Sequence, residues 1–410
     1  MTAYARIDSI MRGLRARLPP FIRLVSAGVL GVSLQTGTSV QGHAGEVQPG
    51  LTLAIAGQAE TVFSKARNAC DPLDIPDAPA RALRTASGTV QLYASHLQNR
   101  RLVGPDLLNL STDCRVVFQG NERDDPAAFD DRAWIASLYT PDGQTIFAAI
   151  HNEFQGHRRP ALCPSGQYMD CWYNAITSAV SHDEGKHFSR TAAGSDLIAA
   201  LPYRYDEVTG HHAGYFNPTN MVLDKGKLFM MVFATEARAQ KPGNCLLRTD
   251  RISDRTAWRG WDGHGFDVTF VDPYAISEAK DAHVCAPVGA AQLRWPVTSL
   301  VRHEPTGLFI ALMMNGAHDG GVFYATSPDL IEWSSPIKLM DGLGEGAYRC
   351  GDSAPIAYPS LIDPRSTDRN FMTIGQSAEL FFTRFNMTGC RTSMDRDLIR
   401  IKIAISPGKN

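Results

Sequence analysis

Hydrophobic and polar residues follow a recurring pattern along the chain, in which two short apolar segments are joined by a polar turn. The turn carries Gly, Asp, Pro or Asn, and a strongly apolar segment comes after it. The copies cover 134–153, 217–236, 295–314 and 358–377, with a more diverged copy at 77–96. β-Branched and aromatic residues on both sides of such a turn are typical of β-hairpins. The chain is therefore predicted to be built of hairpins, and helical periodicity is almost absent.

A second element lies between the hairpins: a strand that runs into a loop with a spaced Asp and an aromatic residue. It occurs at 181–188, 246–258 and 322–333. Successive hairpins begin 57 to 83 residues apart, which is enough for several strands in each interval. Five such units predict an all-β fold, a single five-bladed β-propeller over residues 70–410. An irregular β-sandwich, in which turn signals also recur, is the alternative.

The loop sequences carry a resemblance to known propellers. SHDEGKHF (181–188) resembles the Asp-box of sialidases and related propellers, with Phe188 in place of Trp. SPDLIEW (327–333) resembles the shortened form of that motif in five-bladed glycosidases of the arabinanase, xylosidase and invertase kind. The resemblance covers about residues 70–405 and implies a propeller with glycosidase activity. It also implies that 181–188 is a structural turn, in which Gly185 permits positive φ and Phe188 packs between blades.

The N-terminal segment differs from the rest of the chain. Residues 1–24 hold five Arg and no Lys, an apolar run follows at 24–34, and small residues end at 42–44. This order is typical of a secretory signal peptide, predicted at 1–44, with an N-terminal extension at 45–69. A membrane anchor is the alternative, but the apolar run is shorter than the roughly 20 residues that a spanning helix needs. The mature protein is predicted to be secreted or periplasmic and not bound to a membrane.

Charge and cysteine content limit the classes of partner, cofactor and metal that the sequence is consistent with. The formal net charge of −2 offers no basic surplus for nucleic acid. All eight Cys follow the predicted cleavage site, which favours disulfides in an exported chain, and Cys163–Cys171 is the one pairing that the sequence predicts. No Cys/His cluster has zinc spacing, so neither a metal nor a cofactor is expected, although a structural calcium ion in the central channel stays open. The protein is expected to be a monomer.

The first candidate for catalysis is an acidic stretch at 70–79. Glycoside hydrolysis needs two carboxyl groups on opposite sides of the scissile bond. In the glycosidases that the chain resembles, one of them is an Asp at the start of the first blade, before a Pro. Alignment with the repeat favours Asp77 as base or nucleophile, with Asp74 in reserve. A solvated acidic loop is the alternative.

The second carboxyl group is harder to find. The resembled glycosidases take it from the third blade, but 210–220 contains no carboxylate there. Glu153 is the substitute, because the apolar run FAAI leads directly into His151, Asn152 and Glu153. Partial desolvation at such a strand end would raise the pKa of a general acid. The loop between Cys163 and Cys171 is expected to lie over the mouth of the site. A polar strand end that faces solvent is the alternative.

Further candidates for substrate binding come from the predicted starts of the inner strands and from nearby loops, where aromatic and amide groups suit a sugar. Besides Asp74, His151 and Asn152, they are Tyr173, Asn217, Trp295, Tyr358 and Asp352. Asp131 or Arg132, just before Trp134, also lies at such a start. Arg81 and Arg349 are interpreted as solvated charges, with binding of an anionic sugar as the alternative.

Three functions are consistent with these residues. The first is an exported glycoside hydrolase that acts on a polysaccharide through Asp77 and Glu153. The second is a polysaccharide lyase in which His151 or Tyr173 removes a proton from a uronate. The third is a propeller that binds carbohydrate without catalysis, since one fold hosts all three functions.

Overall fold

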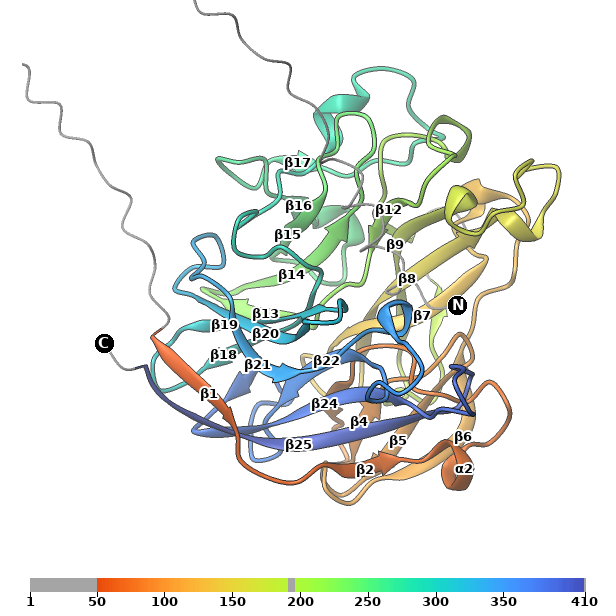
Figure 1. Cartoon of the computed structure of the whole chain (residues 1–410). Helices are drawn as coiled ribbons and strands as arrows, with labels where there is room; N and C mark the ends of the chain where they lie inside the picture. Colours follow the sequence, from red (N-terminus) through yellow and green to blue (C-terminus); the bar gives the residue numbers. More distant parts are fainter. Residues whose placement is uncertain (1–49, 191–195, 409–410) are drawn as a thin grey trace, which may run out of the picture.

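The computed structural model describes residues 50–190 and 196–408 and is almost entirely β (Figure 1). The predicted all-β class is therefore confirmed, whereas the predicted signal peptide at 1–44 lies outside the described residues. Helical segments in this part of the chain are single turns: α2 (Lys65–Asn68), η2 (Pro126–Ala128), η3 (Gly156–Arg158), η4 (Met169–Cys171), η5 (Tyr205–Glu207), η6 (Arg255–Ala257), η7 (Lys280–His283) and η8 (Glu345–Ala347). None of the described helices is long and apolar enough to cross a membrane.

The first sheet is a four-stranded antiparallel meander. Its strands are β3 (Arg81–Arg84), β4 (Val90–Tyr93), β5 (Asn99–Gly104) and β6 (Ser111–Phe118). The β3–β4 turn contains Gly88 at φ +86°, a left-handed conformation that glycine adopts without strain. This is the diverged hairpin that the sequence places at 77–96.

The largest sheet consists of two antiparallel groups. The first holds β7 (Arg132–Tyr139), β8 (Ile146–Gln155), β9 (Trp172–Ser181), β10 (Ser189–Arg190) and β11 (Leu197–Ala199). The second holds β12 (Ala213–Phe216), β13 (Val222–Asp224), β14 (Lys227–Ala234), β15 (Gly243–Thr249), β16 (Arg259–Gly260) and β17 (Val268–Thr269). A short parallel pairing between β9 and β12 joins them, at Tyr173 with Ala213 and Asn174 with Gly214. A Cβ at Gly214 would lie 2.1 Å from the carbonyl oxygen of Asn174, so this close approach requires glycine.

Two further sheets complete the described chain. One holds β18 (Val297–His303), β19 (Phe309–Asn315), β20 (Gly321–Ser327), β21 (Ile337–Asp341) and β23 (Thr373–Ile374). The other holds β22 (Ile356–Ile362), β24 (Ser377–Phe385), β25 (Arg396–Pro407), β1 (Leu51–Ile55) and β2 (Glu60–Phe63). Both β1 and β2 pair with β25, so strands from the predicted extension at 45–69 complete the C-terminal sheet, as Figure 1 shows for β1.

The strand groups follow one another in space as they do in the chain. β3 contacts β7, β14 contacts β18, and β18 contacts β22. The last group returns to the first, because Oγ of Ser360 in β22 donates to the carbonyl of Ala80, 2.7 Å away. The groups therefore close into a ring.

Arg81 ties this ring together. It is 2% exposed, and its guanidinium donates to the carbonyl oxygens of Ala136, Pro218 and Thr298, which belong to three other strand groups. The interpretation of Arg81 as a solvated charge is therefore wrong, and so is the anion-binding alternative. Burying a guanidinium is tolerated here because backbone acceptors surround it.

The Asp-box turns are structural, as predicted. Ser181 Oγ accepts from the backbone N–H of Gly185 at 2.9 Å and donates to Oδ1 of Asp183 at 2.8 Å. Phe188 is 8% exposed and packs edge-on against Tyr93 of the first sheet. The second motif repeats the arrangement, with Trp333 buried. Both turns anchor an aromatic side chain in the core.

All eight cysteines lie in disulfides. The predicted Cys163–Cys171 bridge is confirmed. The pairings that the sequence left open are Cys70–Cys114, Cys245–Cys285 and Cys350–Cys390.

Candidate active site

A pocket of about 470 Å³ is lined by residues of β7, β8, β22 and β25 and of the segments next to β3 and β12. Its volume falls in the range of small-molecule sites. Strands β7 and β8 line it with every second residue, in keeping with the two-residue period of a strand. These residues are Arg132, Trp134 and Ala136 from β7, and His151, Glu153 and Gln155 from β8. Asp77, His96, Asn217, Tyr358 and Arg396 complete the polar wall.

Asp77 is tightly held at one side of the pocket. Its Oδ1 accepts from the hydroxyl of Tyr358 at 3.1 Å and from the guanidinium of Arg396. Its side chain is 9% exposed and that of Arg396 is 3% exposed. A buried carboxylate needs such a partner, because an unpaired charge away from water is costly. Arg396 therefore stabilises Asp77 in its ionised form.

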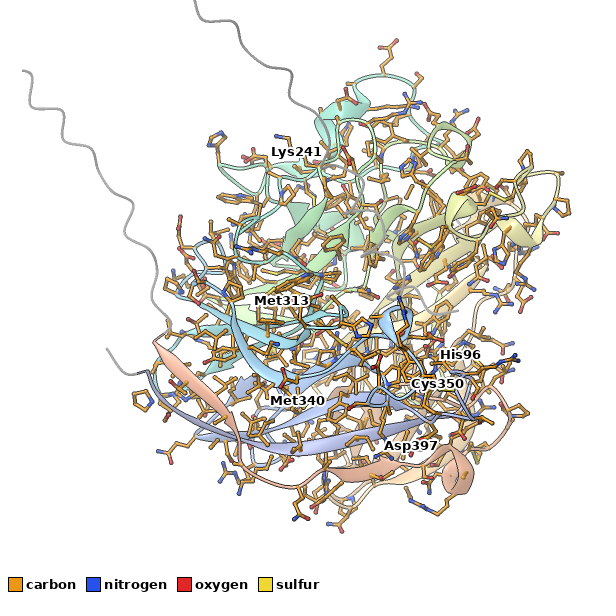
Figure 2. All side chains as sticks on the ribbon, in the orientation of Figure 1. His96, Lys241, Met313, Met340, Cys350 and Asp397 are labelled. Carbon is orange, nitrogen blue, oxygen red and sulfur yellow. A yellow bond between two sulfur atoms is a disulfide. The ribbon has the colours of Figure 1, made fainter. Side chains whose placement is uncertain are left out.

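His96 lies next to this pair, with Nε2 3.5 Å from Oδ2 of Asp77. Burial lowers the pKa of His96, the charge of Asp77 opposes that shift, and Arg396 adds to it. The imidazole is therefore neutral at neutral pH, and its ring packs edge-on against Trp134. Figure 2 labels His96 near the first and last sheets, well apart from Lys241 in the loop between β14 and β15.

Glu153 occupies a different environment on β8. The residue is 7% exposed, and its Oε2 accepts from the side-chain amide of Gln155 at 2.8 Å. Its Oε1 lies 3.3 Å from Nε2 of His151. No Lys or Arg of the described chain lies within ion-pair distance of Glu153. This buried carboxyl group is thus held by an amide and an imidazole, and Asp77 by a guanidinium.

His151 is oriented by its other ring nitrogen. The backbone N–H of Asn217 donates to Nδ1 at 3.2 Å, and Nε2 is the ring atom that faces Glu153. The side-chain nitrogen of Asn174 lies 2.7 Å from Nε2 of His151, and the side-chain oxygen of Asn174 lies 2.5 Å from Nε2 of His212. A buried polar chain therefore extends from Glu153 into the interior.

An aromatic stack supports the back of the pocket. His212 stacks on Trp172 with ring centroids 3.9 Å apart, and Trp172 stacks on Tyr168 at 4.7 Å. Tyr168 belongs to the loop closed by Cys163–Cys171 and lines the pocket, as predicted for that loop. Burial lowers the pKa of His212 to about 3, with smaller contributions from the charges of His151 and His211. His212 is therefore neutral throughout the physiological range.

Two pocket residues adopt left-handed backbone conformations, Asn217 at φ +51° and Tyr358 at φ +58°. Each precedes a proline at the same position of the repeat. Positive φ is uncommon for residues with a side chain, especially a bulky one such as Tyr, and costs about 1–3 kcal/mol. Such strain is characteristic of residues whose side chains are fixed for function.

Five of the ten predicted site residues line the pocket: Asp77, Glu153, His151, Asn217 and Tyr358. Asn152 does not, because strand alternation directs it to the opposite face from His151 and Glu153. Asp74 lies beside a separate cavity of about 30 Å³, where its Oδ2 accepts from the backbone N–H of Cys70.

The remaining predicted residues serve the fold elsewhere. Tyr173 is buried and donates its hydroxyl to the carbonyl of Tyr203 at 2.9 Å. Trp295 packs on Phe323, with ring centroids 4.8 Å apart. Asp352 accepts from the backbone N–H of Arg349 at 2.7 Å, in an exposed turn.

Several pocket residues were missed by sequence reasoning. Arg396 is 319 positions from its partner Asp77, and no local motif marks it. His96 lies in the loop between β4 and β5 and His157 in η3, with no distinctive spacing, whereas Gln155 is the last residue of β8. Only Gln155 had a recognisable signal, since it continues the alternation of His151 and Glu153.

No group of three or more His, Cys, Asp and Glu residues in the described ranges is arranged to hold a metal ion. A structural calcium ion therefore stays a prediction from the sequence alone.

No protein-family model matches the sequence, and no curated protein matches it either. Solved structures are similar at low identity. The catalytic domain of a GH62 α-L-arabinofuranosidase from Coprinopsis cinerea has a TM-score of 0.48 at 9% identity, over 85% of this chain and 97% of that one. The α-L-arabinofuranosidase PaAbf62A from Podospora anserina has a TM-score of 0.48 at 9% identity, over 88% and 99%. An α-L-arabinofuranosidase from Lactobacillus brevis has a TM-score of 0.48 at 12% identity, over 83% and 94%.

Proposed function

We propose that this protein is an exported glycoside hydrolase that cleaves a cell-wall or environmental polysaccharide in the pocket between Asp77 and Glu153. One observation carries the proposal: two buried carboxyl groups from separate strand groups line the same pocket in contrasting surroundings. Glycosidases need two carboxyl groups in different protonation states, and different surroundings are what separate them.

The surroundings assign the roles. Asp77, ion-paired with Arg396, is the ionised group and acts as nucleophile or as base for water. Glu153, with no guanidinium or ammonium group in contact, carries the proton that the leaving oxygen receives. After the transfer, the amide of Gln155 donates to the carboxylate of Glu153, and the imidazole of His151 lies beside it.

The architecture that we propose is a five-bladed β-propeller. The first and last sheets each count as one blade, the β18–β21 sheet as another, and the largest sheet as two joined by the β9–β12 pairing. Pairing of β1 with β25 would close the ring between the ends of the chain. The hydrogen bonds of Arg81 to the carbonyls of three other groups support this count.

The pocket wall supports a sugar as ligand. Trp134, Tyr168 and Tyr358 offer aromatic faces among polar groups, a combination that suits the apolar faces and the hydroxyls of a sugar ring. Leu73 and Met394 are 39% and 38% exposed and give the pocket an apolar edge. The four disulfides support an extracellular or periplasmic location.

A polysaccharide lyase is the second candidate, because the pocket also holds a guanidinium, Arg132, and the imidazoles of His96 and His151. A lyase needs a base near the proton α to a uronate carboxyl group and a cation to neutralise that group. Tyr173 does not serve as this base, since its hydroxyl is buried against Tyr203.

A panel of polysaccharides tests the proposal. The parent protein is incubated with each polymer beside Asp77→Asn and Glu153→Gln, and both reducing ends and near-ultraviolet absorbance are measured. A hydrolase releases reducing ends without absorbance, and both variants lose most of that activity. Absorbing products would establish a lyase. Glycan binding without cleavage, or full activity in both variants, would overturn the assignment of Asp77 and Glu153.

A further inference from the structure

Arg132 is a cation of the pocket that has no hydrogen-bond or ion-pair partner among the described residues. It stands directly opposite Glu153 in the antiparallel pairing of β7 with β8, so both side chains project into the same cavity. No hydrogen bond or ion pair connects the guanidinium of Arg132 with any described residue, and its Nε is buried without an acceptor. A buried donor that lacks an acceptor is costly, and native structures retain few of them.

The anions of the pocket are already held by other groups. Asp77 is paired with Arg396, and Glu153 is bonded to Gln155 and faces His151. Arg132 lies one strand away from Glu153 and still makes no ion pair with it. The charge of Arg132 is therefore available to a ligand.

The other buried polar atoms of the pocket wall that lack a hydrogen-bond partner are also nitrogens. Buried side-chain nitrogens without an acceptor include Nε of Arg132 and Arg396, Nε1 of Trp134 and Nδ2 of Asn217. All four are obligate hydrogen-bond donors. The two remaining atoms of this kind in the pocket are imidazole nitrogens, of His96 and His157. No unpartnered oxygen of the described residues faces this pocket, so its unused hydrogen-bonding capacity favours a ligand rich in acceptors.

We propose that Arg132 binds an anionic substituent of the sugar, a carboxylate or a sulfate, so that the substrate is an acidic polysaccharide. This inference rests on the proposed function, because the pocket must be a saccharide site. When Glu153 is protonated to act as an acid, Asp77 and Arg396 cancel each other and Arg132 leaves one uncompensated positive charge. An anionic substituent on the bound sugar restores neutrality in that state.

The chemistry of arginine fits this role. The guanidinium presents a planar set of donors that matches a carboxylate or a sulfate oxygen pair. Hydrogen bonds to charged groups are stronger than neutral ones, and a neutral sugar would leave this cation unpaired. We expect an acidic sugar to bind roughly 10- to 100-fold more tightly than its neutral counterpart.

The test measures binding without turnover. Isothermal titration calorimetry on the Glu153→Gln protein compares galacturonate, glucuronate and galactose 6-sulfate with galactose and glucose. The second variant carries Arg132→Gln in addition to Glu153→Gln. The control variant carries Arg349→Gln in addition to Glu153→Gln, which removes an exposed guanidinium outside the pocket.

The inference predicts preferential binding of an acidic sugar, loss of that preference in the Arg132→Gln protein, and no change in the Arg349→Gln protein. The uronate and sulfate arms identify which anion is recognised. Equal or absent binding of acidic and neutral sugars would overturn the inference, as would a preference that survives Arg132→Gln. Failure of hydrolysis in the polysaccharide panel would instead refute the catalytic assignment, since these titrations do not depend on turnover.

Discussion

Nε2 of His151 lies 3.3 Å from Oε1 of Glu153, and the backbone N–H of Asn217 holds the other nitrogen of the ring. The two residues are two positions apart on β8, so strand geometry places both side chains in the pocket. His151 is therefore a positioning residue for the proposed acid. Asn174 and His212 extend the same chain of contacts into the core.

Replacing His151 with Phe should lower kcat roughly 10- to 100-fold with little change in KM, because Glu153 loses the imidazole that orients it. His151→Gln, which keeps a polar side chain near the same place, should recover part of the rate. Equal rates in both variants would show that His151 does not position Glu153.

The acid and the base can be separated by the leaving group. Glu153→Gln should lose roughly 100- to 10,000-fold in rate on a natural linkage but far less on a dinitrophenyl glycoside, whose leaving oxygen needs no proton. Asp77→Asn should lose both activities, because it removes the group that attacks or activates water. Steady-state kinetics of both variants on the natural linkage and on the dinitrophenyl glycoside test this assignment. If Asp77→Asn instead kept its rate on the dinitrophenyl glycoside and Glu153→Gln lost it, the roles of acid and base would be exchanged.

His212 makes folding stability depend on pH. Burial lowers its pKa in the folded state to about 3, while the unfolded chain takes up a proton near 6.5. The stability contributed by this neutral imidazole is therefore fully present above about pH 6.5 and is lost as the pH falls toward 3, by about 1.4 kcal/mol per pH unit.

Urea denaturation between pH 4 and 7 measures this dependence. The parent should lose stability more steeply with falling pH than His212→Gln, which keeps an amide beside Asn174 and cannot titrate. Parallel pH curves for the two proteins would show that His212 is not the titrating group.

The Asp-box turn is predicted to matter for stability and not for chemistry. Phe188→Ala should destabilise the fold by roughly 3 kcal/mol, because it empties a buried aromatic site against Tyr93. Lys186→Ala in the same turn is exposed and should change stability little. Chemical denaturation reports the loss, and kcat at a temperature where both proteins are folded should stay unchanged. A fall in kcat in folded Phe188→Ala would assign the turn a role in the site.

The Cys163–Cys171 bridge is predicted to hold part of the substrate site. Replacing both residues with Ser should destabilise the protein by about 2–3 kcal/mol through the freed loop. It should also raise KM, because Tyr168 in that loop lines the pocket. Removing Cys245–Cys285, which is buried away from the pocket, should lower stability and leave KM unchanged. An unchanged KM in the Cys163/Cys171 variant would exclude the loop from substrate binding.

The pattern of apolar and polar residues by itself determined the hairpins at 77–96, 134–153, 217–236 and 295–314 and the Asp-box turns. These features are local, because strand period and turn chemistry act over a few residues. The hairpin predicted at 358–377 was wrong, because β23 pairs with β18 and β22 pairs with β24. The local signal was enough to find Glu153, His151, Asn217 and Tyr358, and the family resemblance added Asp77. It failed for Asn152, where three consecutive polar residues looked like one site although a strand sends alternate residues to opposite faces.

The tertiary structure alone decided the electrostatics of the pocket. Arg396 reaches Asp77 from the last strand, and Arg132 faces Glu153 without pairing with it. Arg81, which reads as a surface charge, instead lies at the centre of the ring among backbone carbonyls. Contacts between residues hundreds of positions apart leave no local trace in the sequence, because ring closure and not periodicity brings them together. The sequence alone shows that an arginine is a cation, but only the fold shows which group it pairs with.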